Sequence, residues 1–183
     1  EFMVNLYFSG LLHLVTSSCF AQTDIVEDFE TSTTSYNWMG DNCIIDTYSQ
    51  NPDITSDNPS SRVMKYEDVG GQFANVRFDY GENFNLSSTY EHVFSVFIYV
   101  PSPSVTGNET NQISLKLQNA SLATPWSTQT EIVKPIELDK WQTITFNFNE
   151  DSYTNLNPES SPPSQRSDLS RVLLQVNDED NSS

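Results

Sequence analysis

Residues 112–119 read QISLKLQN, and this stretch indicates the fold class because its apolar and polar side chains alternate strictly. Successive side chains of a β-strand point to opposite faces of the sheet. One face of this segment is therefore apolar and belongs in a core. The other face carries Ser114, Lys116 and Gln118 and belongs on an outer sheet surface.

Eight other runs have strand-like composition, and turn-forming residues separate them. They span residues 24–30, 43–48, 62–67, 74–80, 92–100, 131–138, 141–148 and 171–176. In the run 74–80, the same alternation places Arg77 on a polar face. No stretch of helical period reaches a convincing length. We predict an all-β fold, a β-sandwich or jelly roll of about nine antiparallel strands.

The charge of the chain excludes one class of partner. The 183 residues carry a net charge of −17 and the pI is about 4.1. Nucleic acid requires a basic footprint that releases counterions, so no nucleic-acid partner is expected. The same charge disfavours anionic lipid, and no segment approaches the roughly 18 consecutive apolar residues that span a bilayer.

The first 21 residues are predicted to be a cloning remnant followed by a signal peptide, with cleavage between Ala21 and Gln22. This predicts a secreted, extracellular protein whose residues 22–183 form a single domain. Cys19 supports an alternative in which a lipid attaches the chain to the cell surface. The chain ends in the polar stretch VNDEDNSS, so we expect the domain to lack its last strand.

Catalytic motifs are weak in this sequence. His92 is the only histidine after the predicted cleavage, and no G-x-S-x-G motif accompanies it. Asp28 and Glu30 would share one face of a strand, as paired glycosidase carboxylates do. With 25 acidic residues such pairs arise by chance, so we interpret these two as solvated or metal-binding.

Three aromatic side chains lie among turn-forming residues. Tyr36 and Trp38 occur in SYNWMGDN (35–42), and Trp126 occurs in SLATPWSTQT (121–130). Rings in such positions either stack on a sugar or anchor their loop by burial, and the sequence leaves both alternatives open.

The order of these elements resembles the carbohydrate-binding modules of marine Bacteroidetes, which are β-jelly-roll modules like families 4, 16 and 22 and related to galactose-binding-like domains. The resemblance rests most on VEDFE (26–30) and LDKWQTITFNF (138–148). It implies non-catalytic binding of a polysaccharide, of marine algal origin, on behalf of an attached glycoside hydrolase or polysaccharide lyase. The net charge would repel an acidic polymer unless local Lys, Arg or calcium offset it.

The resemblance also implies a site and a metal. Trp38 and Tyr36 would face Trp126 across a glycan groove, while Arg77, Lys116 and Gln118 would donate or accept hydrogen bonds. A structural calcium would bind Asp28 and Glu30. Two alternatives remain, a secreted jelly-roll polysaccharide lyase or hydrolase using Tyr, His92 and Arg77, and a cell-surface adhesin or lipoprotein attached through Cys19.

Overall fold

A computed structural model describes residues 4–8, 26–70, 73–88, 92–105 and 110–176 of the chain. These residues form strands in two antiparallel sheets, with three short 3-10 turns. The strands are β1 (Val4–Phe8), β2 (Met39–Asp41), β3 (Cys43–Gln50), β4 (Arg62–Asp68), β5 (Asn75–Phe84), β6 (Val93–Tyr99), β7 (Gln112–Gln118), β8 (Thr130–Pro135), β9 (Gln142–Asn147), β10 (Thr154–Asn155) and β11 (Leu169–Val176). The 3-10 turns are η1 (Ser102–Ser104), η2 (Pro125–Thr128) and η3 (Pro163–Gln165).

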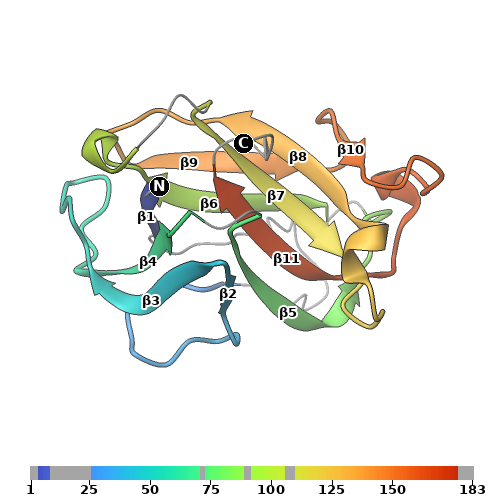
Figure 1. The fold of residues 1–183 in the computed structure, drawn as a ribbon, viewed down its shortest axis with the longest axis horizontal. Helices are drawn as coiled ribbons and strands as arrows, with labels where there is room; N and C mark the ends of the chain where they lie inside the picture. The colour runs from blue at the N-terminus through green and yellow to red at the C-terminus, as the bar shows by residue number, and fades with distance from the viewer. Residues whose placement is uncertain (1–3, 9–25, 71–72, 89–91, 106–109, 177–183) are drawn as a thin grey trace.

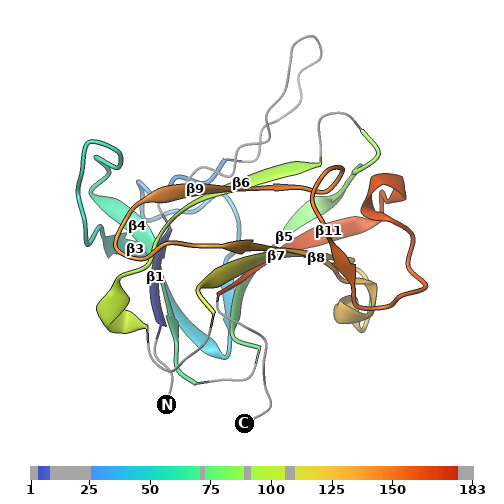
Figure 2. The same ribbon diagram turned by 90° about the horizontal axis from the view of Figure 1, so that it is seen from above.

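The two sheets lie face to face. The five-stranded sheet has the order β3-β4-β1-β6-β9, and the six-stranded sheet has the order β10-β8-β7-β11-β5-β2. Figure 1 is viewed onto the six-stranded sheet, and Figure 2 shows the two layers from above. The predicted all-β, antiparallel β-sandwich is confirmed. No helix among the described residues is long and apolar enough to cross a membrane.

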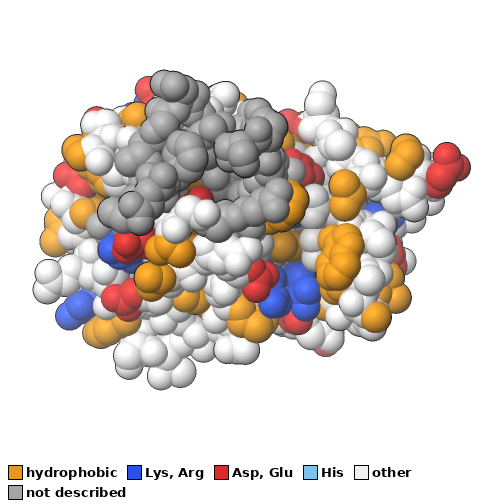
Figure 3. All heavy atoms as spheres, viewed as in Figure 1, with side chains coloured by type: hydrophobic (Ala, Val, Ile, Leu, Met, Phe, Trp, Pro, Cys, Tyr) orange, Lys and Arg blue, Asp and Glu red, His pale blue; other side chains and the backbone are white. Residues whose placement is uncertain are grey.

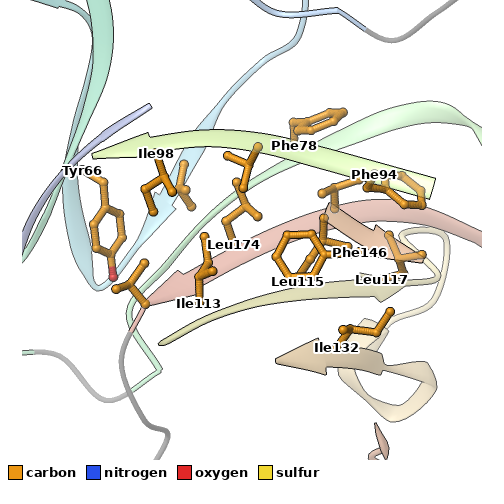
Figure 4. Close-up of a cluster of buried hydrophobic side chains, with 14 of the residues drawn as sticks. Tyr66, Phe78, Phe94, Ile98, Ile113, Leu115, Leu117, Ile132, Phe146 and Leu174 are labelled. Carbon is orange, nitrogen blue, oxygen red and sulfur yellow. The ribbon is translucent and has the colours of Figure 1, made fainter. Parts of the chain in front are cut away.

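The core lies between the sheets and follows the alternation of the sequence. Ile113, Leu115 and Leu117 of β7 are fully buried, as are Val76 and Phe78 of β5. Figure 4 shows these β7 side chains meeting side chains from the opposite sheet. The residues between them point the other way, so on β7 and β5 the outer face of the six-stranded sheet carries the polar side chains.

The strand predicted at residues 24–30 is wrong for residues 26–30, the part of it that the structure describes. Residues 26–30 are irregular. Phe29 has a positive φ of 54°, and the Glu30 amide donates to Asp28 Oδ1 at 3.0 Å. An Asp side chain that bonds the backbone two residues on makes a turn and so competes with strand pairing. The strands β2 and β10 were not predicted, because two or three residues are too short to show a period.

Strand β1 comes from the segment predicted as a signal peptide. It pairs with β4 over the five positions Val4↔Asp68 to Phe8↔Met64, and with β6 at Tyr7↔Tyr99 and Phe8↔Ile98. The pairing shows where residues 4–8 lie and does not test cleavage, so the signal peptide stays a prediction. Cys19, the predicted cleavage position and the last seven residues lie outside the described part of the chain.

Candidate binding groove

The outer face of the six-stranded sheet carries a groove of about 660 Å³. Its volume falls within the usual range of small-molecule and cofactor sites. Its lining combines polar and charged side chains of the central strands with apolar side chains from loops. The lining residues are Asp41, Asn42, Phe73, Asn75, Arg77, Lys116, Gln118, Trp126, Gln129, Leu156, Arg171, Leu173 and Gln175.

Strand register brings residues distant in sequence into rows across this face. Leu173 of β11 is paired with Arg77 of β5 on one side and with Lys116 of β7 on the other. Arg171 pairs with Gln118 in the same way, two residues along β11. Four of the six predicted carbohydrate-contacting residues, Arg77, Lys116, Gln118 and Trp126, therefore line one groove.

Both arginines of the groove are held by carboxylates. Arg77 donates from Nε to Asp41 Oδ2 at 2.6 Å and from Nη2 to Asp41 Oδ1 at 3.3 Å. Arg171 makes the same paired contact with Asp79, at 2.6 Å and 3.0 Å. The hydrogen bonds from Arg171 lower the pKa of the Asp79 carboxyl below its usual range, and those to Asp79 raise the pKa of Arg171. Both shifts favour the charged forms of the Arg171–Asp79 pair.

Lys116 lies at the floor of the groove and is only 4% exposed. Its Nζ donates to Gln175 Oε1 at 2.7 Å and lies 3.7 Å from Glu131 Oε2. Burial lowers the pKa of the Lys116 ammonium, and the neighbouring Glu131 carboxylate partly opposes this by favouring the charged form. A buried charge of this kind needs a partner, and Glu131 supplies it.

Amide side chains complete the floor. Gln118 Nε2 donates to Gln129 Oε1 at 2.7 Å, and Gln129 Nε2 donates to Glu131 Oε2 at 3.2 Å. Asn75 is 7% exposed, and its Nδ2 donates to the Phe73 carbonyl at 2.8 Å. Asn75 Oδ1 is buried and accepts no hydrogen bond from the described residues.

The rim of the groove is apolar and exposed. Trp126 and Leu156 are each 57% exposed, and Phe73 is 52% exposed. Figure 3 looks onto this face and shows Lys and Arg side chains beside Asp and Glu side chains, with hydrophobic side chains around them. Exposed rings above a buried polar floor suit a ligand that has both C–H faces and hydroxyl groups.

The turn η2 holds Trp126 outward. Pro125, at its start, is buried, while the ring of Trp126 is not. Thr128 Oγ1 donates to the Pro125 carbonyl at 2.7 Å and accepts from the Asn119 amide at 2.9 Å. The buried Arg166 donates from Nη1 to the Thr128 carbonyl at 2.7 Å. The backbone under Trp126 is thus fixed from two sides.

Tyr36 and Trp38 do not line the groove. Both rings pack on Phe78, with centroid distances of 4.7 Å each. Phe78 points into the core, whereas its neighbour Arg77 points into the groove, so the two predicted rings lie on the core side of the sheet. Trp38 Nε1 also donates to the buried Glu27 at 3.4 Å. The loop-anchor alternative describes both residues.

Asp28 and Glu30 are exposed and do not approach the groove. Asp28 Oδ1 accepts from the Glu30 backbone amide, which directs it toward the chain itself. No group of three or more His, Cys, Asp or Glu side chains within the described residues is arranged to hold a metal ion. A calcium site at these two residues stays a prediction.

The sequence reasoning missed several groove residues, above all Arg171 and Gln175. The signal was present, because RVLLQV (171–176) alternates in the same way as the runs that identified Arg77 and Lys116. The acidic partners were harder to find. Asp41 and Asp79 become partners of the arginines only through strand pairing and side-chain direction.

Comparison with known proteins returned no matching family model, no matching curated protein and no matching solved structure.

Proposed function

We propose that this chain is a non-catalytic polysaccharide-binding module and that the groove on the six-stranded sheet is its binding site. One observation carries the proposal: a buried floor of amide and ion-paired side chains lies between exposed rings and apolar side chains. Sugar rings offer C–H faces for the rim and hydroxyls for the floor. The module would act outside the cell, on an algal polysaccharide, and direct an attached hydrolase or lyase to it.

Binding is favoured over catalysis by the composition of the groove. Its described lining contains no His or Tyr. His92 lies elsewhere, with Nδ1 2.8 Å from the Ser88 carbonyl. Every carboxylate at the groove is engaged by Arg, Lys or Gln. A carboxylate whose oxygens already accept hydrogen bonds from a cation is a poor general base, because taking a substrate proton would break those bonds.

Affinity electrophoresis of the 183-residue chain on a panel of algal and plant polysaccharides tests the proposal. We expect at least one glycan to retard the protein and Trp126→Ala to remove about tenfold or more of that affinity, as loss of an exposed aromatic anchor does. Leu122→Ala is the matched control, because Leu122 is an exposed side chain on the same loop that does not line the groove.

Two results would contradict the proposal. One is a folded chain that no glycan on the panel retards. The other is cleavage of the polymer, seen as new reducing ends or double bonds, which would favour the lyase or hydrolase. If Leu122→Ala weakened binding as much as Trp126→Ala, the groove would not be the site.

A further inference from the structure

We propose that the groove takes an uncharged, hydroxyl-rich glycan and rejects polymers bearing uronate or sulfate groups. This inference rests on the proposed function and specifies the ligand class of the same groove. It follows from how the charges of the groove are paired.

Each cation of the groove is paired with a carboxylate of the protein. Its cations are Arg77, Lys116 and Arg171, three of the eight Lys and Arg residues of the chain. Each has its own carboxylate, at 2.6 Å for both arginines and 3.7 Å for Lys116. The cluster therefore has no net charge, although it collects cations that would by themselves predict an anionic ligand.

An acidic sugar gains little from such a cluster. To reach either guanidinium face-on, it must displace a carboxylate that already makes two hydrogen bonds to it. The displaced carboxylate stays attached to the sheet nearby and repels the incoming anion. The remaining net charge of −17 adds a long-range repulsion.

The extent of the groove indicates an oligosaccharide rather than a single sugar. Trp126 lies just before β8, and Phe73 lies just before β5, with β7 and β11 between these strands. Neighbouring strands are about 4.8 Å apart, so the two rings are separated by roughly 14 Å across the strands. They are also offset along the strands, because β8 and β5 begin at opposite ends of the sheet. A linear chain can cover this distance and contact both rings.

The test compares laminarin, galactomannan and xylan, which are neutral, with alginate and a sulfated galactan in affinity electrophoresis at low and high salt. We expect retardation by one or more neutral polymers, unchanged by salt, and no retardation by the acidic ones. Retardation by an acidic polymer alone would overturn this inference and leave the binding function standing. No retardation by any polymer would overturn both.

A single substitution sharpens the test. Asp41→Asn removes the negative partner of Arg77 and keeps an oxygen that can accept a hydrogen bond. We expect the variant to gain binding to alginate by about tenfold and to lose that gain in high salt, as screening requires. Asp57→Asn is the control, with the same change in net charge at an exposed residue outside the groove.

The outcome of this comparison is decisive in both directions. Gain of alginate binding in Asp41→Asn alone supports the pairing argument. If Asp57→Asn gains as much alginate binding, the overall charge of the chain, and not the groove, determines which glycans bind. If neither variant gains, the pairing of Arg77 does not exclude anions, and the inference fails.

Discussion

The loops that carry Trp38 and Trp126 look alike in sequence and differ in structure. Each places a ring among turn-forming residues. The ring of Trp38 packs against Phe29 and Phe78 at 5.5 Å and 4.7 Å. The ring of Trp126 stands over the groove on a fixed turn. The two rings differ because the first loop packs on the core side of the six-stranded sheet, whereas the second lies over its outer face. One ring serves stability and the other is available to a ligand.

The largest effect expected from this comparison is on folding. Trp38→Ala should lower the free energy of unfolding by about 2–4 kcal/mol, because it removes a large ring from the edge of the core. Trp126→Ala should change it by less than about 0.5 kcal/mol, as substitutions of exposed residues usually do. Urea denaturation of the two variants measures this directly. Equal losses of stability would remove the distinction between the loops.

The next largest effect on stability is expected at Glu27, whose carboxylate accepts two hydrogen bonds from the loop that carries Trp38. Glu27 Oε2 accepts from the Ser35 amide at 2.7 Å and from Trp38 Nε1 at 3.4 Å. Glu27→Ala leaves two donors without this partner, and we expect a loss of about 1–3 kcal/mol of unfolding free energy.

Glu27→Gln, which keeps an acceptor oxygen, is the matched control and should lose less. Glycan affinity should be the same in both variants, because Glu27 does not line the groove. A drop in affinity without a drop in stability would show that the Trp38 loop reaches the ligand after all.

A smaller effect is expected from the turn beneath Trp126. Thr128→Val keeps the shape of the side chain and removes the hydroxyl that bonds Pro125 and Asn119. We expect glycan affinity to fall roughly fivefold while the free energy of unfolding falls by about 1 kcal/mol, the usual net value of a hydrogen bond. Titration with the bound glycan measures the first and urea denaturation the second. Unchanged affinity would mean that Trp126 contacts the glycan equally well without these two hydrogen bonds in the turn.

The smallest effect is a pH dependence from the Trp38 loop. Burial raises the pKa of the Tyr36 hydroxyl, with further contributions from Tyr80 and Glu27. The folded chain therefore keeps this proton at pH values where the unfolded chain, with a pKa of about 10, has lost it. Unfolding then becomes easier as pH rises above about 10, and the stability that depends on the neutral phenol is lost there.

Tyr36→Phe should reduce the slope of stability against pH in this alkaline range. Tyr153→Phe, at an exposed tyrosine, should leave the slope as it is. Unfolding curves recorded at several pH values between neutrality and this range give the slopes. An unchanged slope in Tyr36→Phe would mean that its hydroxyl reaches solvent in the folded chain.

Local alternation predicted most of this fold, and it failed where structure depends on distant partners. The runs around β7 and β9 have a clear period of two, so their buried faces could be assigned from the sequence. The same reasoning placed Arg77, Lys116 and Gln118 on one outer face. The direction of Trp38 could not be assigned, because it depends on Phe78, which is distant in sequence and reaches the ring through sheet register.

Strand β1 has a consequence for the behaviour of the protein in solution. β4 and β6 do not pair with each other, and β1 is the strand that joins them. Any form of the chain without residues 4–8 would have two open sheet edges facing one gap, with backbone amides and carbonyls free to bond another strand. Such a form would be prone to strand exchange between molecules. A size in gel filtration that depends on protein concentration would then report on this gap and not on the groove of the six-stranded sheet.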